Sequence, residues 1–85
     1  MSVYRVVYRP RAARQIEKLP RDVQDQLRPA IAALATDPRP HNCKKLVGPG
    51  GFWRIRVGQY RVIYLIEDRI RVVTISEAVN RRDAY

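Results

Sequence analysis

The sequence has few of the residue types on which disulfide bonds and metal sites depend. Cys43 is the single cysteine among 85 residues, so no internal disulfide can form, and a reducing compartment is expected. His41 is the single histidine, and the 8 Asp and Glu residues are scattered along the chain. Metal sites in proteins need clustered histidine, cysteine or carboxylate ligands. We therefore expect no metal and no cofactor.

Long hydrophobic runs are also missing. No segment approaches the roughly 20 apolar residues that a membrane-spanning helix needs, and the N-terminus lacks a signal-peptide pattern. The chain contains no internal repeat and no low-complexity segment. Its length suits one hydrophobic core. These absences predict a single domain over residues 1–85 in the cytoplasm, without a membrane partner.

Acidic residues are in short supply relative to basic ones. The 17 Lys and Arg residues against 8 Asp and Glu give a formal net charge of +9. Such an excess favours a polyanion or an acidic protein as the partner. The solvated surface of an ordinary soluble protein also carries many charges, so composition alone does not separate these readings.

The most informative stretch is residues 51–65, where apolar and polar residues alternate on both sides of Gly58-Gln59. This pattern predicts two β-strands joined by a two-residue turn in which Gly58 supplies a positive φ. Trp53, Ile55, Val57, Tyr60, Val62 and Tyr64 would then share one face of the hairpin. Arg54, Arg56 and Arg61 would lie on the other face, with Arg56 directly opposite Arg61. Like charges in that position destabilise a strand pair, so we expect this face to bind an anion.

The rest of the chain predicts two helices and two further strands. Residues 2–8 are rich in β-branched and aromatic residues, and apolar residues recur at helical spacing from Pro10 to Leu19 and from Val23 to Leu34. Pro29 lies inside the second pattern and predicts a kink or a late helix start. Residues 36–42 are turn-like, residues 44–47 are a candidate strand start, and residues 70–75 form the last predicted strand. The tail from Glu77 onward suits a strand end or a short helix.

This order, β-α-α-β-β-β, is of the α+β class. It predicts an antiparallel sheet, mixed at the N-terminal strand, with a helical hairpin on one face. The apolar hairpin face would pack on the helices, and the face with the arginines would stay open to solvent.

Three stretches resemble the RelE/ParE toxin superfamily, on the RelE side. They are residues 44–48 (KKLVG), residues 53–64 (WRIRVGQYRVIY) and residues 80–85 (NRRDAY). The resemblance covers the whole chain and implies the RelE-like microbial ribonuclease fold. It also implies the toxin of a bacterial type II toxin–antitoxin system that cleaves mRNA in the ribosomal A site of the 30S subunit. The implied partner is a cognate acidic, RelB-like antitoxin, in a toxin–antitoxin hetero-oligomer.

The resemblance also implies a set of site residues. The family positions that match Arg54, Arg56, Arg61, Arg81 and Tyr85 line the active site. We expect Arg54, Arg61 and Arg81 to clamp the scissile phosphate and Tyr85 to act as the base. Lys44, Lys45 and Arg56 are expected to bind RNA through its phosphates.

The chemistry of these residue types agrees with that assignment. A ribonuclease without a metal must stabilise a phosphorane that carries extra negative charge, and arginine suits phosphate oxygens well. Arginine stays protonated and is not a base, whereas a tyrosine whose pKa is lowered from about 10 by neighbouring arginines can accept the 2′-hydroxyl proton. Asn80 stands where many relatives have histidine. An amide does not transfer protons at neutral pH, so this position predicts slow cleavage.

Several alternatives remain open at this point. Arg54 and Arg56 also suit the solvated side of a strand, Lys44 and Lys45 suit a solvated loop, and Tyr85 suits a frayed terminus. For the whole protein, the alternatives are a ParE-like toxin that poisons DNA gyrase and a basic RNA-binding module without catalysis. The presence of Arg61, Arg81 and Tyr85 at the positions that match the family's active-site residues favours the ribonuclease.

Overall fold

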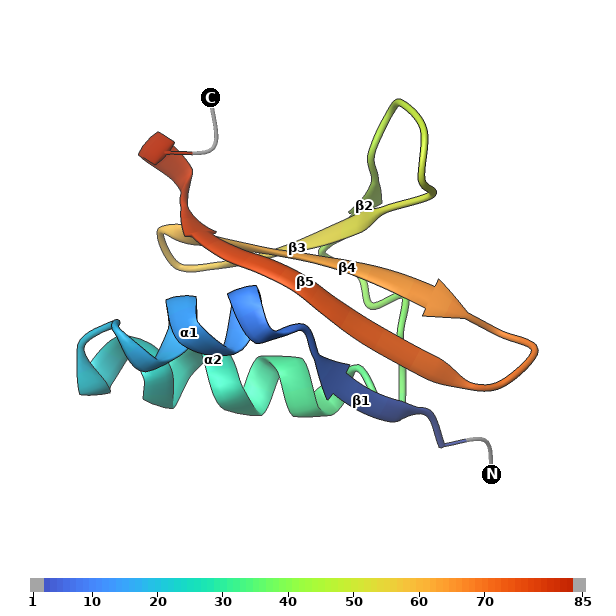
Figure 1. Ribbon diagram of the computed structural model, residues 1–85, viewed down its shortest axis with the longest axis horizontal. Helices are drawn as coiled ribbons and strands as arrows, with labels where there is room; N and C mark the ends of the chain where they lie inside the picture. The colour runs from blue at the N-terminus through green and yellow to red at the C-terminus, as the bar shows by residue number, and fades with distance from the viewer. Residues whose placement is uncertain (1–2, 84–85) are drawn as a thin grey trace.

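The computed structural model describes residues 3–83 and shows two helices against a five-stranded sheet (Figure 1). The elements follow the chain in the order β1 (Arg5–Tyr8), α1 (Pro10–Glu17), α2 (Arg21–Ala33), β2 (Cys43–Lys45), β3 (Trp53–Val57), β4 (Tyr60–Glu67), β5 (Val72–Asn80) and a 3₁₀ turn, η1 (Arg81–Asp83). The fold is therefore α+β, as the sequence predicts. No helix among the described residues is long and apolar enough to cross a membrane.

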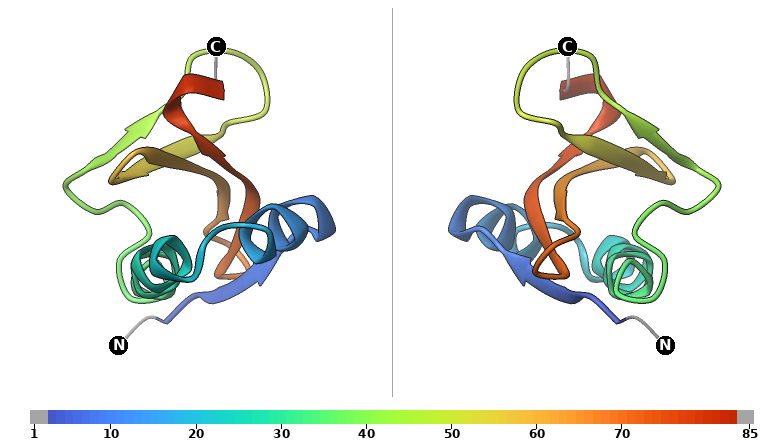
Figure 2. Two further views of the ribbon diagram at one scale, coloured as in Figure 1. Left: turned by 90° about the vertical axis from the view of Figure 1, so that its left-hand side faces the viewer. Right: turned by 90° about the vertical axis from the view of Figure 1, so that its right-hand side faces the viewer.

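The sheet has the strand order β1-β5-β4-β3-β2. Strands β2 to β5 pair in antiparallel fashion, while β1 pairs with β5 in parallel. The predicted mixed character at the N-terminal strand is thus confirmed. The chain connects β1 to β2, at opposite edges of the sheet, through α1 and α2. Both helices lie on one side of the sheet, and η1 and the loop between β2 and β3 project from the other side (Figures 1 and 2).

The core lies between the helices and the sheet face that the hairpin pattern predicts to be apolar. Helices α1 and α2 contribute Ala12, Ile16, Leu27 and Ile31, each at most 1% exposed. The sheet contributes Ile55, Val62, Tyr64, Val73 and Ile75, each at most 2% exposed. Side chains two apart on a strand share a face, so burial of this set directs Arg54, Arg56 and Arg61 to the other face.

The predicted hairpin register is confirmed. Val57 pairs with Tyr60, and Arg56 pairs with Arg61. Gly58 has a φ of 57°, which is the left-handed conformation that such a short turn requires and that glycine adopts without a steric penalty. The two arginines therefore lie side by side on adjacent strands.

The structure differs from the sequence prediction in three elements. The candidate strand start at residues 44–47 is a separate strand, β2, over Cys43–Lys45, so four strands follow the helices instead of three. Strand β5 runs from Val72 to Asn80, which lengthens the predicted strand over residues 70–75 and agrees with a strand end for the tail. Between Ile63 and Tyr64 the register shifts, which leaves Ser76 as a bulge in β5. The late start of the second helix is wrong, because α2 begins at Arg21 and includes Pro29. Proline removes the bond to the carbonyl of Asp25, and Asp25 is exposed, so water can bind that carbonyl.

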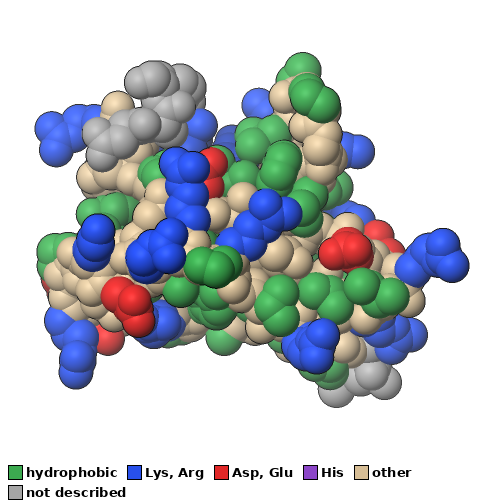
Figure 3. All heavy atoms as spheres, in the orientation of Figure 1, with side chains coloured by type: hydrophobic (Ala, Val, Ile, Leu, Met, Phe, Trp, Pro, Cys, Tyr) green, Lys and Arg blue, Asp and Glu red, His purple; other side chains and the backbone are tan. Residues whose placement is uncertain are grey.

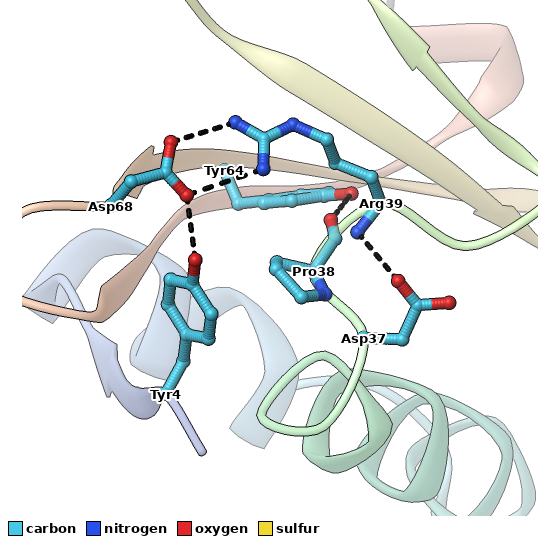
Figure 4. A network of polar contacts seen from close by, with 6 residues as sticks. All are labelled: Tyr4, Asp37, Pro38, Arg39, Tyr64 and Asp68. Atoms are coloured by element: carbon cyan, nitrogen blue, oxygen red, sulfur yellow. Dashed lines mark hydrogen bonds and ion pairs between the residues drawn. The ribbon is translucent and has the colours of Figure 1, made fainter. Parts of the chain in front are cut away.

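A polar network fastens the loop after α2 to the sheet (Figure 4). Asp68, in the turn between β4 and β5, accepts a hydrogen bond of 2.6 Å from the Tyr4 hydroxyl and forms an ion pair of 2.9 Å with Arg39. The buried Tyr64 hydroxyl donates to the carbonyl of Pro38 at 2.8 Å. The Arg39 guanidinium lies 5.0 Å from the ring centroid of Trp53. The network therefore fixes the chain that leads into β2.

Candidate functional site

The open face of the sheet carries a pocket of about 220 Å³ at the β2–β3–β4 end. Its lining consists of five cationic and two apolar residues, namely Lys44, Lys45, Arg54, Arg56, Arg61, Leu46 and Val47. Five of the seven residues that the sequence predicts as site residues thus border one pocket. None of the described residues that line it is a carboxylate.

Strand register explains why these cations come together. Arg54 pairs with Lys44 of β2 on one side and with Ile63 of β4 on the other. Arg56 pairs with Arg61, so four cations from three strands occupy neighbouring positions on one face. Arg54 and Arg61 are half-buried, whereas Lys44 and Arg56 are exposed. Backbone pairing therefore holds Arg54 and Arg61 more firmly than a loop could.

Lys45 differs from the other pocket cations. It pairs with Trp53, which packs on the apolar side of the sheet, and its ammonium lies 5.9 Å from the centroid of the Trp53 ring. Lys45 therefore borders the pocket, but its charge is directed toward an aromatic face. The sequence alone does not show that Lys44 and Lys45 lie on different faces of the sheet, because the face of each side chain depends on how β2 pairs with β3.

Arg81 is not among the residues that line this pocket. It opens η1, directly after β5, and Arg61 pairs with Val79 two residues earlier. The Arg81 N–H donates to the carbonyl of Gln59 at 2.7 Å, which ties η1 to the hairpin turn. Tyr85 lies outside the described residues, so its role as the base stays a prediction.

Asn80 has a structural role that the sequence reading missed. Its side-chain oxygen accepts a hydrogen bond of 3.1 Å from the N–H of Arg82. An asparagine side chain that bonds the backbone two residues later is a common way to start a tight turn. Asn80 therefore orients η1 and its two arginines, and the turn-forming tendency of asparagine was the available signal.

Two apolar residues of the pocket, Leu46 and Val47, were also missed. They follow β2 directly, and no local pattern in this segment indicates that the loop folds toward the arginines. Asn42 was missed as well: its side-chain amide donates to the carbonyl of Arg56 at 3.1 Å, so the loop before β2 helps to hold β3.

Other pockets are larger but lack this concentration of charge. A pocket of about 460 Å³ is lined by four successive residues, 67–70, of the turn between β4 and β5. Another, of about 320 Å³, lies between α1 and the β4–β5 pair, and Lys18 is the one cation among its described lining residues. The volume of a pocket does not by itself locate the functional site of this protein, since an anion-binding site is defined by converging hydrogen-bond donors. Among the described residues, no group of three or more His, Cys, Asp or Glu side chains could hold a metal ion.

The chemistry open to the small pocket is binding of phosphate groups. Arginine offers donors in a planar fork that matches phosphate oxygens, and its charge persists at every usable pH. Cations fixed before a reaction stabilise negative charge that develops in the transition state. The pocket can therefore hold a phosphodiester and can stabilise its displacement.

Solved structures of toxin–antitoxin complexes contain chains similar to this one. A chain of the archaeal RelE–RelB complex from Pyrococcus horikoshii is 28% identical with a TM-score of 0.83, and the match covers 99% of this chain and 100% of that chain. A chain of the intact RelBE complex from E. coli is 26% identical with a TM-score of 0.78, over 91% of this chain and 95% of that one.

A YoeB/ParE toxin from Agrobacterium tumefaciens, at 13% identity and a TM-score of 0.76 over 89% of this chain and 96% of that one, shares the fold. No curated protein sequence matches the chain significantly.

A family model also matches the sequence almost from end to end. It is described as the ParE toxin of the type II toxin–antitoxin system, parDE, and it matches residues 4–85. Because the match spans nearly the whole chain and the fold agrees with RelE structures, the chain belongs to the RelE/ParE superfamily of type II toxin–antitoxin toxins.

Proposed function

We propose that this toxin is a ribosome-dependent endoribonuclease that cleaves mRNA in the A site and so stops translation. The observation that carries the proposal is the pocket in which Lys44, Arg54, Arg56 and Arg61 converge on one face of the sheet. Folding alone does not favour two arginines in direct cross-strand contact. A bound phosphodiester removes that repulsion and uses the same charges for binding.

The proposed reaction is an attack of the 2′-oxygen on the adjacent phosphorus. A new 2′-O–P bond forms, the bond from phosphorus to the 5′-oxygen breaks, and the products are a 2′,3′-cyclic phosphate and a free 5′-hydroxyl. Arg54, Arg61 and Arg81 stabilise the added negative charge. Tyr85 accepts the proton of the 2′-hydroxyl.

Protonation of the leaving oxygen is the slow part of this scheme. The Asn80 side-chain oxygen already accepts the N–H of Arg82, and an amide does not donate a proton at neutral pH. The 5′-oxygen then takes its proton from water, and cleavage is slower than with a histidine at this position. This proposal predicts a toxin of modest turnover that depends on the ribosome for alignment of its substrate.

An acidic antitoxin is the proposed protein partner. The similar chains from Pyrococcus horikoshii and E. coli were solved in complexes with RelB. A domain with a charge of +9 attracts an acidic chain strongly. The antitoxin would be partly disordered alone, would fold around the toxin in a hetero-oligomer, and would cover or displace the site residues. We place both proteins in the cytoplasm, where mRNA is translated.

A gyrase poison is the second candidate, because the matching family model is that of the ParE toxin. Such a toxin would act by binding a protein and would have no need of a phosphate pocket. The converging cations therefore favour RNA cleavage.

Brief induction of the toxin in a bacterial host, followed by primer extension on cellular mRNA, tests the proposal. We expect new 5′ ends inside coding regions. The variant Tyr85→Phe should cut roughly 10²–10⁴-fold more slowly, because only the hydroxyl is lost. Intact messages with a DNA-damage response would support the gyrase reading instead. Full cleavage by Tyr85→Phe would overturn the base assignment while leaving the nuclease in place.

A further inference from the structure

The loop between β2 and β3 holds a fixed course beside the cation pocket. The N–H of Leu46 donates to the carbonyl of Phe52 at 2.9 Å and closes the loop at its base. Gly50 lies directly on the Phe52 ring, and a Cβ at this position would come within 2.7 Å of the ring. Gly50 also has a φ of 97°, which favours glycine. The contact with Phe52 thus packs the loop on its own last residue, directly before β3.

Val47 is the large hydrophobic residue that this loop presents to solvent. Its exposure is complete, at 104% of the reference area, and it lines the same pocket as Lys44, Arg54, Arg56 and Arg61. Figure 3 shows the loop projecting from the body of the molecule, with hydrophobic side chains on it. Single exposed apolar residues are common on protein surfaces. Val47 is different because it adjoins several fixed cations that suit a polyanion.

Position in the fold separates Val47 from the other exposed hydrophobic residues. Ile70, which is 65% exposed, lies in the turn between β4 and β5, and Val3, which is 60% exposed, lies at the start of the described chain. Neither lines the cation pocket. Only Val47 combines an exposed apolar side chain with a phosphate-binding surface among the large hydrophobic residues that the structure describes as exposed.

We infer that Val47 contacts a nucleobase of the RNA strand whose phosphates occupy the cation pocket, and that it contributes to the choice of nucleotide there. This inference rests on the proposed function. An RNA strand offers negative phosphates and apolar base faces within each nucleotide, and single-stranded bases are free to leave the stack. The pocket cations suit the phosphates, and Val47 gives a base an apolar surface at the pocket's rim. A base contact also carries sequence information that phosphate contacts lack.

The test compares two probes, a short single-stranded RNA and inorganic polyphosphate, which has the charge but no bases. Val47→Ser should weaken RNA binding by about 3- to 10-fold, because part of one apolar contact is lost. Polyphosphate binding and the salt dependence of RNA binding should stay unchanged. Val47→Ile should bind RNA as the wild type does. Ile70→Ser, which removes an exposed apolar residue away from the pocket, is the matched control and should change neither probe.

The outcomes separate this inference from the proposed function. Equal RNA binding by Val47→Ser and wild type would overturn the base contact while leaving the nuclease intact. Weaker binding of the antitoxin, with unchanged RNA binding, would assign Val47 to the protein interface and would also overturn it. If Val47→Ser bound RNA and polyphosphate equally more weakly, the substitution would have displaced the loop, and the inferred contact between Val47 and a base would be overturned. If the wild type binds RNA no better than polyphosphate and leaves mRNA intact, the proposed function fails, and the base contact fails with it.

Discussion

At the scale of single residues, Asp68 connects segments that are distant in the sequence. It accepts the Tyr4 hydroxyl at the N-terminal end and pairs with Arg39 from the loop after α2 (Figure 4). The hydrogen bonds from Arg39 and Tyr4 hold the pKa of Asp68 below its usual 3.8, and the same carboxylate raises the pKa of Tyr4. A lowered carboxyl pKa means that folding stabilises the ionised form.

This linkage gives a pH prediction. Asp68 contributes stability above its unfolded pKa, near 3.8, and loses it as the pH falls through the lower folded value. Asp68→Asn should therefore lower the melting temperature at pH 6 and converge with the wild type in acid. Glu67→Gln, a neighbouring exposed carboxylate outside the network, is the control and should show little difference at either pH. A constant deficit of Asp68→Asn across the pH range would contradict the charge-based account.

Some of the site residues could be placed from the sequence, and others could not. The alternation around Gly58 was sufficient to predict that Arg56 faces Arg61. It was insufficient to separate Lys44 from Lys45, because their faces depend on pairing with a strand eight or more residues later. Val47 carried no local signal, since its closeness to the arginines comes from the course of the loop.

At the scale of elements, one face of the β3–β4 hairpin stabilises the fold and the other destabilises it. The inward residues Ile55, Val62 and Tyr64 are buried, whereas Arg56 and Arg61 repel each other on the outward face. The repulsion between the two arginines lowers stability, so their presence suggests that the hairpin gives up some stability in favour of binding an anion.

Arg56→Thr tests this trade. Removing one of the two like charges should raise the free energy of unfolding by about 0.2–1 kcal/mol. The same change should weaken RNA binding and should reduce the slope of log affinity against log salt by about 0.7. Denaturant unfolding and RNA titrations at several salt concentrations measure both effects. Arg5→Thr on β1, where the partner is Val72, is the control and should leave stability nearly unchanged. Loss of stability in Arg56→Thr would contradict the repulsion.

Elements with strong local patterns were predicted as helices and strands, whereas the strands that depend on distant pairing were predicted only as candidates. Helix α1 and the hairpin follow from apolar spacing, proline and glycine. Strand β2 has only three residues, and it exists because β3 pairs with it. The extension of β5 to Asn80 requires β4 as a partner, and the bulge at Ser76 lets this polar stretch continue the strand.

At the scale of the whole molecule, positive charge extends beyond the pocket. Lys and Arg side chains are spread over the face of the molecule drawn in Figure 3, which includes α1, β1 and β5. Such a distribution speeds encounters with a polyanion through long-range attraction. Under the proposed function, the local pocket would then set where the RNA strand is held. The α+β class and the superfamily were accessible from sequence because motifs along the whole chain agree, whereas the pocket's apolar rim required the folded chain.

The central claim is that Arg61 stabilises the reacting phosphate in an RNA-cleaving site. The most direct measurement is the single-turnover rate of mRNA cleavage on programmed ribosomes by wild type and Arg61→Ala. We predict a loss of roughly 10²–10³ in rate, or about 3–4 kcal/mol of barrier, with a thermal melt to show that the variant is folded. Arg69→Ala, in the turn between β4 and β5, is the control and should cleave at the wild-type rate. Cleavage by folded Arg61→Ala at the wild-type rate would contradict the account.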